Sequence, residues 1–284
     1  MKKYISCFLC LVIVVTSICS CSHKEAESTD VSGEVTQEVI SEVSETTEVT
    51  EEIIETEITE TETEPYVKKE SHYTFKTHVS STLMNEIMGE DMLEGYNNLV
   101  DAVLNGEDSF ECKDEYTFKW VMGQFPYLLF PVDTTISSLL FPYLLFPVVA
   151  EYLCMDEYRD GRGYFHFTIS DEEFQEKLQE FETVTVDILN SCLEDDYSDF
   201  EKALALYLYF IKTYVYDYDT YDAMRYEYQE NISGYRLLMG ETGICQEISV
   251  AYSYLLLQAG VDATVLKAVR GFDNEPHQWS LVTI

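Results

Sequence analysis

The stretch GICQEISVAYSYLLLQAGVDATVLKAVRGFDNEPHQWSLVTI, residues 243–284, decides the fold of this chain. Apolar residues at helical spacing predict a helix over 246–259, and Gly260 ends it because glycine adopts the left-handed backbone of a helix C-terminus. Residues 262–270 are rich in β-formers, and 277–284 alternate like a second strand after a loop. The predicted order is helix, strand, turn, strand, in a protein of the α+β class.

Two residues of this stretch carry candidate chemistry. Cys245 lies at the start of the predicted helix, where free N–H groups and the helix dipole lower a thiol pKa and favour a thiolate nucleophile. His277 opens the last strand and is the candidate base. Taken alone, a cysteine that opens a helix is usually a small buried side chain, and a histidine on a strand is usually a partly buried core residue. Together, in this order, they indicate a catalytic pair.

The order of elements, with Gly-x-Cys at 243–245, Gly260-Val261 and His277-x-Trp279, resembles the transglutaminase-like superfamily. That superfamily places a Cys on a helix and His and Asp on adjacent strands. The similar part runs from about Ser198 to the end.

The resemblance implies a papain/transglutaminase-like core with Cys245 as nucleophile. His277 would be the base that keeps the thiol ionised and later protonates the leaving amine, and Trp279 would support its strand. The backbone N–H of Cys245 and the hydroxyl of Tyr235 are candidate donors to the oxyanion.

The sequence also departs from the superfamily pattern. Ser280 stands where relatives often have Asn or Glu, and Thr264 stands where they commonly have Arg. In addition, no Asp follows His277. We therefore expect a fragment that is truncated inside the catalytic core, poorly soluble and nearly inactive, with an unpaired strand at 277–284. The alternative is that an acid from the Tyr- and Asp-rich segment 214–228 replaces the missing one.

The predicted function is that of a thiol enzyme that acts on amide bonds of a protein or peptide through a thioester, with no cofactor. The sequence does not choose between crosslinking, peptide hydrolysis and glutamine deamidation. A non-catalytic surface lipoprotein that uses the same fold as a binding or assembly module is the alternative. No metal site is expected, because no zinc or EF-hand spacing is present. Cys112, Cys154 and Cys192 are predicted core thiols.

The predicted domain 163–284 begins with a strand at 163–169. Capping boxes at Ser170 and Ser198 then start two helices. In the second helix, the apolar stripe predicted to pack on a core is Ala203, Leu206, Tyr207, Phe210, Ile211 and Tyr214. Segment 214–228 either lines a cleft or is a solvated loop, and the second interpretation is preferred.

A mainly helical region is predicted over 67–162, with one helix at about 81–105. Within it the octapeptide FPYLLFPV occurs at 125–132 and again at 141–148. Its prolines exclude a single membrane-spanning helix. An exact repeat indicates a recent duplication or a gene error, so deleting 125–140 is expected to leave a folded domain with an unchanged or higher melting temperature.

The N-terminus predicts export and anchoring. Lys2 and Lys3 precede a short apolar run, and the sequence Ile18 to Cys21 resembles a bacterial lipobox. Residues 1–21 would then be a lipoprotein signal, with Cys21 as the lipidated residue at the extracytoplasmic face of the cell membrane. An ordinary signal peptide or an uncleaved anchor remains the alternative.

Residues 22–66 are rich in Glu and Thr and contain almost no aromatic residue, which predicts a disordered acidic stalk. The whole chain carries 53 acidic and 17 basic residues, a formal charge of −36. This charge excludes nucleic acid as a partner.

Overall fold

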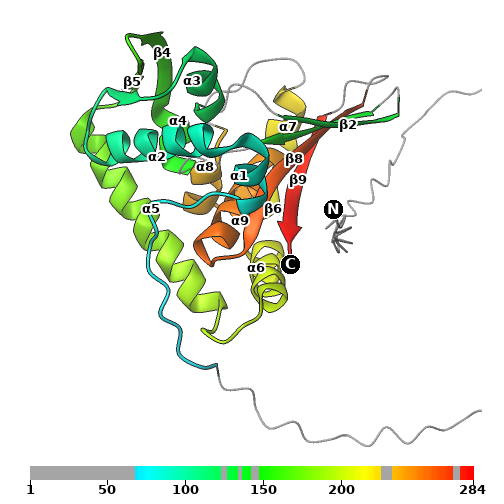
Figure 1. Cartoon of the computed structure of the whole chain (residues 1–284). Helices are drawn as coiled ribbons and strands as arrows, with labels where there is room; N and C mark the ends of the chain where they lie inside the picture. The colour runs from blue at the N-terminus through cyan, green and yellow to red at the C-terminus, as the bar shows by residue number, and fades with distance from the viewer. Residues whose placement is uncertain (1–67, 123–126, 134–135, 142–146, 225–231, 271–275) are drawn as a thin grey trace, which may run out of the picture. The chain divides into compact units, whose positions relative to one another are not determined.

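The computed structural model describes residues 68–122, 127–133, 136–141, 147–224, 232–270 and 276–284 (Figure 1). The predicted signal segment, the lipobox at Cys21 and the stalk lie outside these residues. Among the described residues, none of the helices combines the length and apolar character that crossing a bilayer requires.

The described residues form helices, two antiparallel sheets and a short parallel pair of strands, β6 and β7, which confirms the α+β class. The helices are α1 (Thr82–Met88), α2 (Glu90–Leu104), α3 (Glu115–Val121), α4 (Pro147–Tyr152), α5 (Asp171–Cys192), α6 (Asp199–Thr213), α7 (Tyr218–Met224), α8 (Gly234–Met239) and α9 (Cys245–Gln258). The strands are β1 (Ser109–Glu111), β2 (Tyr127–Asp133), β3 (Ile136–Phe141), β4 (Leu153–Arg159), β5 (Arg162–Phe167), β6 (Val215–Tyr216), β7 (Thr242–Gly243), β8 (Asp262–Arg270) and β9 (Pro276–Thr283).

The sheet that positions the candidate pair has the strand order β2-β3-β8-β9, with antiparallel neighbours throughout. Ala268 of β8 lies opposite His277 of β9, and Leu266 lies opposite Trp279. Helix α9 packs against both β8 and β9, as Figure 1 shows. The helix and the two strands predicted within residues 243–284 are therefore confirmed in that order, and the predicted turn at 271–275 lies outside the described residues.

A second sheet, β1-β5-β4, packs with α2 and α3 over an aromatic core. The rings of Phe110 and Phe118 have centroids 5.9 Å apart, and a Cβ added to Gly163 would lie 2.2 Å from Phe118. Only glycine fits at position 163, because any side chain there would displace the Phe118 ring.

The boundary predicted between residues 162 and 163 is not a domain boundary. It falls inside β5, which pairs with β4. In addition, β3 lies before this boundary in the sequence and pairs with β8, which lies after it. Residues 68–284 belong to one compact unit. The region predicted as mainly helical contributes strands to both sheets, because its short helices are separated by extended segments.

The two copies of FPYLLFPV enter different elements. Most of the first copy forms β2, whereas the second provides the last residue of β3 and, from Pro147, the start of α4. Residues 142–146 lie outside the described part. Residues 125–140 thus supply β2 and most of β3, and β3 pairs with β8. That the protein stays folded when these residues are deleted remains a prediction.

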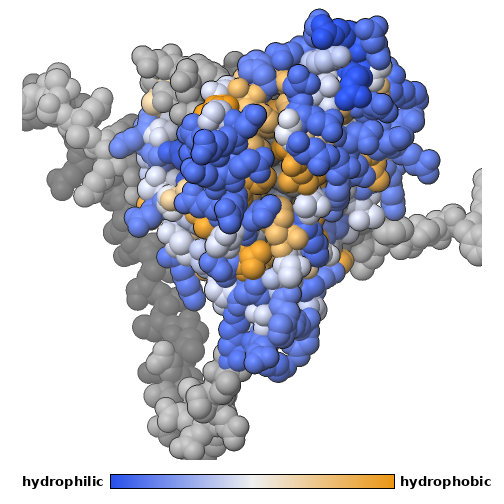
Figure 2. Space-filling view, turned by 90° about the vertical axis from the view of Figure 1, so that its left-hand side faces the viewer, coloured by the Kyte–Doolittle hydropathy of each residue, from blue (hydrophilic) through white to orange (hydrophobic). Residues whose placement is uncertain are grey.

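Other predicted elements appear with adjusted limits. The helix expected over 81–105 is divided at Gly89, whose φ of 89° suits glycine alone, into α1 and α2. Ser170 and Ser198 cap α5 and α6. The predicted capping box is complete at Ser198, with Glu201, whereas at Ser170 the structure shows the bond from the Glu173 N–H to the serine hydroxyl. The surface that Figure 2 shows is mostly hydrophilic, with apolar residues exposed between hydrophilic ones.

Candidate active site

The start of α9 is held by a buried carboxylate. Glu247 is completely buried, and its Oε2 accepts a hydrogen bond of 2.9 Å from the N–H of Ile244, the residue before Cys245. This bond satisfies one of the N–H groups that a helix leaves free at its N-terminus. Glu247 therefore fixes the backbone on which the Cys245 thiol is carried.

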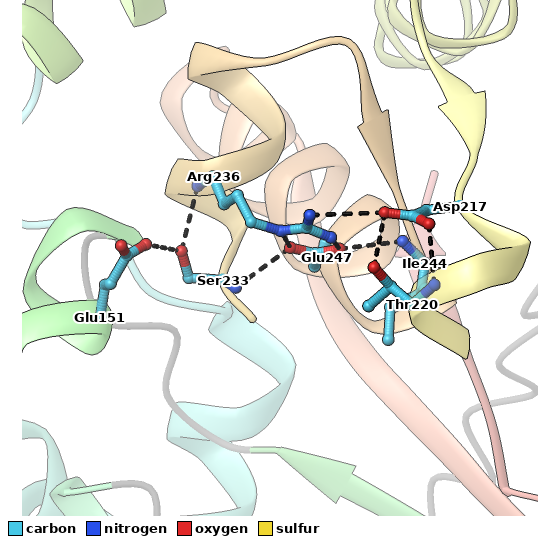
Figure 3. Close-up of polar contacts among 7 residues, drawn as sticks. All are labelled: Glu151, Asp217, Thr220, Ser233, Arg236, Ile244 and Glu247. Atoms are coloured by element: carbon cyan, nitrogen blue, oxygen red, sulfur yellow. Dashed lines mark hydrogen bonds and ion pairs between the residues drawn. The ribbon is translucent and has the colours of Figure 1, made fainter. Parts of the chain in front are cut away.

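Arg236 of α8 neutralises Glu247 in a two-bond pair. Its Nε and Nη2 lie 2.7 Å and 2.6 Å from the two carboxylate oxygens, and the N–H of Ser233 donates to Oε1 at 3.2 Å (Figure 3). A planar guanidinium matches a carboxylate in this geometry, so the buried charge is compensated. The Ser233 hydroxyl in turn donates to Glu151.

The same guanidinium reaches Asp217, directly after β6. Arg236 Nη1 lies 3.4 Å from Asp217 Oδ2, and the Thr220 N–H and hydroxyl donate to Asp217 at 2.9 Å and 2.7 Å (Figure 3). The Thr220 N–H, then its hydroxyl, then Arg236 hold the pKa of Asp217 below its usual value. The Asp217 N–H also donates to the Gly243 carbonyl at 3.0 Å. Asp217, the residue after Tyr216, is thus linked through Arg236 and Glu247 to the start of the Cys245 helix.

A row of polar side chains sets the position of α9 on β9. The Gln278 side-chain amide donates to Ser249 Oγ at 3.1 Å, and the Ser280 hydroxyl donates to the Ser249 carbonyl at 3.1 Å. Ser253 donates to Ser280 Oγ at 2.8 Å. Buried polar groups need such partners, so these bonds specify one alignment of the helix and the strand. Ser280, which departs from the superfamily pattern, is part of this row.

This alignment brings Cys245 and His277 together. The His277 imidazole and the Gln278 backbone N–H both interact with the thiol and lower its pKa. Burial raises the pKa of Cys245, but the His277 bond, the Gln278 N–H, the His277 charge and the Tyr216 hydroxyl outweigh it, so the pKa lies below its usual value.

The pKa of His277 shifts in the opposite direction. The hydrogen bond with Cys245 raises it, burial lowers it, and the thiolate charge raises it further, so that it lies above its usual value. Both shifts favour a thiolate beside an imidazolium. Cys245 is partly buried and His277 keeps an exposed surface.

Tyr216 is a site residue that the sequence prediction missed. Its hydroxyl interacts with the Cys245 thiol, whose pKa it lowers, and with the Cys245 backbone N–H. The preferred interpretation of 214–228 as a solvated loop is wrong here, because the segment contains β6 and α7 and Tyr216 is partly buried. The parallel pairing of Val215 and Tyr216 with Thr242 and Gly243 brings it there, and no local pattern reveals that contact.

Tyr235, the side chain predicted to donate to the oxyanion, lies away from the Cys245–His277 pair. Its hydroxyl is 3.4 Å from Glu180, and its ring packs against Tyr152 and Phe181. Trp279 does lie beside His277, with ring centroids 5.8 Å apart. Among the described residues, no carboxylate contributes to the pKa shift of His277.

The remaining described cysteines, Cys112, Cys154 and Cys192, form no disulfide with one another or with Cys245. Only Cys112 is buried, so the prediction of core thiols is met fully at that position alone. Within the described ranges, no group of His, Cys, Asp and Glu could hold a metal ion. No model of a known protein family and no curated protein sequence matches this chain.

Proposed function

We propose that this protein is a thiol enzyme that acts on amide bonds through a Cys245–His277 pair in a papain/transglutaminase-like core. The observation that carries the proposal is the interaction between the two side chains, which lowers the pKa of the thiol and raises the pKa of the imidazole. A cysteine with no catalytic role has no need of a histidine held against it by an aligned helix and strand.

In the proposed reaction, the Cys245 thiolate attacks the carbonyl carbon of an amide and forms a tetrahedral intermediate. The C–N bond then breaks as His277 gives its proton to the leaving amine, and a thioester remains. Water or a second amine attacks the thioester and passes its proton to His277. The thiolate leaves as the new bond forms, which restores the original ion pair.

In this proposal, the Tyr216 hydroxyl and the Cys245 N–H are the candidate donors to the oxyanion. In the free protein they bond to each other and the hydroxyl also bonds to the thiol. A substrate oxygen would take the place of the hydroxyl on the Cys245 N–H and accept from the displaced hydroxyl. Such donors commonly contribute about 3 kcal/mol to acyl transfer.

The proposal includes export and a lipid anchor at Cys21, which would hold the enzyme at the extracytoplasmic face of the membrane. The acidic charge of the chain favours protein or peptide substrates with basic residues. Crosslinking and hydrolysis share the thioester and differ only in what resolves it.

The test is capture of the acyl-enzyme. The full chain is incubated with a panel of glutamine-containing peptides and peptide amides, quenched in acid and analysed by peptide mass spectrometry. We expect an acyl adduct on Cys245 in the parent and in Cys112→Ser, and none in Cys245→Ser. An adduct on another cysteine would refute the assignment of the nucleophile. A folded parent with a rapidly alkylated Cys245 and no adduct on any peptide would instead support the binding module.

A further inference from the structure

Helix α6 has two apolar faces, and only one of them packs against the other described residues. Ala203, Leu206 and Phe210 are buried, and the Phe210 ring contacts Tyr252 of α9 with centroids 5.5 Å apart. Ile211 was predicted to share this inner face, but it is 55% exposed. It belongs to a second row of apolar residues on the outer side of the helix.

This outer row is continuous. Its members are Phe200, Leu204, Leu208 and Ile211, with exposed fractions of 47%, 44%, 39% and 55%. Their spacing of four, four and three residues keeps them within an arc of about 80° on the helix surface. Val215, 65% exposed, follows just beyond the helix end. An aligned row of large apolar side chains is the pattern of a helix that packs against another helix.

The charges beside the row limit what can cover it. Helix α6 contains two acidic residues, Asp199 and Glu201, and two basic residues, Lys202 and Lys212, so it is neutral in a chain of formal charge −36. A basic partner would be attracted more strongly to other parts of this surface. A second copy of the chain, which is itself strongly acidic, would be repelled least here.

The distribution of these charges also complements itself. The acidic residues lie in the first turn of α6 and Lys212 lies in the last turn, where it forms no ion pair with another described residue. If two copies pair with α6 antiparallel, Lys212 of each copy approaches Glu201 of the other on the same side of the contact. A parallel pair would instead bring the two Lys212 side chains to one end of the contact and the two acidic turns to the other end.

We propose that the outer row of α6 is a self-association surface, on which two copies of this chain form a two-fold symmetric dimer with antiparallel α6 helices. Figure 1 shows α6 at the margin of the described fold, with α9 on its inner side. The contact is small, since one helix of this length spans about 22 Å. We therefore expect a weak dimer, with a Kd on the order of 10 μM. The proposal is independent of the proposed enzymatic function.

The first test is sedimentation equilibrium of the full chain over a concentration series. Leu208→Glu should raise the Kd of the dimer at least about tenfold, because it places two carboxylates near the symmetry axis. Ile87→Glu, at an apolar residue of α1 that is 40% exposed, is the matched control and should leave the Kd unchanged. A parent that stays monomeric at several times the expected Kd, or a dimer that Leu208→Glu does not weaken, would overturn the proposal.

The second test reports the direction of the helices. Leu208→Cys, near the middle of the row, should form a disulfide-linked dimer under mild oxidation beyond the background of the parent. Phe200→Cys, at one end, should not, because an antiparallel pair places its two copies far apart. Equal crosslinking at both positions would contradict the antiparallel arrangement.

The third test changes the charges of Lys212 and Glu201. Lys212→Glu should weaken the dimer, and adding Glu201→Gln should restore part of the lost affinity, since glutamine can still close the capping box with Ser198. Circular dichroism melting of each variant separates loss of the dimer from loss of the fold. If Lys212→Glu folds normally and leaves the Kd unchanged, the electrostatic part of the proposal is wrong.

Discussion

Cys112 and Cys245 are two thiols of one molecule that differ in their partners. Cys112 lies after β1 in the aromatic core, and its pKa is raised to about 11. Burial is the main cause, the Gly163 N–H offsets part of the increase, and the charge of Asp114 adds to it. Cys245 is also partly buried, yet its pKa is lowered. Burial alone makes a cysteine unreactive, and a histidine and directed hydrogen-bond donors reverse that effect.

The largest expected effect on this difference comes from the support of Cys245. Arg236→Leu leaves Glu247 charged, buried and without its counter-ion, and we expect it to lower the free energy of unfolding by about 3 kcal/mol or more. Cys245 should lose its rapid alkylation at the same time. Thermal unfolding followed by circular dichroism measures the first effect.

The control for that variant is Arg159→Leu, which removes an exposed ion pair with Glu157. It should leave the melting temperature close to that of the parent, since exposed pairs contribute little. An equally small effect of Arg236→Leu would show that the network does not hold the site.

A smaller effect is expected from Tyr216→Phe. The variant removes a hydrogen bond to the Cys245 thiol, so the thiol pKa should rise and the alkylation rate at neutral pH should fall roughly three- to tenfold. Tyr218→Phe, on a neighbouring exposed ring, is the control and should leave the rate unchanged. An unchanged rate in Tyr216→Phe would remove this residue from the site.

The smallest effect is expected at the other thiol. Asp114→Asn removes a negative charge that raises the pKa of Cys112 and still permits capping of α3. The pKa should fall slightly, but Cys112 should stay unreactive near neutral pH because burial is the main cause of its shift. Rapid alkylation of Cys112 in this variant would show that charge, rather than burial, keeps it inert.

Much of the C-terminal fold was predictable because local patterns determine it. The apolar spacing of α9, the stop at Gly260 and the alternation of β9 identified the elements that carry Cys245 and His277. The caps at Ser170 and Ser198 likewise marked two helix starts.

The rest depends on contacts between distant segments. The parallel bridge of β6 with β7 brings Tyr216 to Cys245, and the Arg236–Glu247 pair joins α8 to α9 across eleven positions. The octapeptide repeat also shows that local sequence does not determine every element, because identical residues enter β2 in one copy and the start of α4 in the other. No property of the repeated segment itself could have predicted that difference.

The proposed ion pair is tested most directly by the pH dependence of alkylation at both thiols. Iodoacetamide labelling of the full chain is quantified for the peptides that contain Cys245 and Cys112, in the parent and in His277→Ala. We predict that Cys245 is alkylated near neutral pH with a midpoint below that of an ordinary thiol, while Cys112 reacts only at alkaline pH. His277→Ala should move the Cys245 midpoint upward and leave Cys112 unchanged. Equal profiles for the two thiols in the parent, or a Cys245 midpoint that does not move in His277→Ala, would contradict the ion pair.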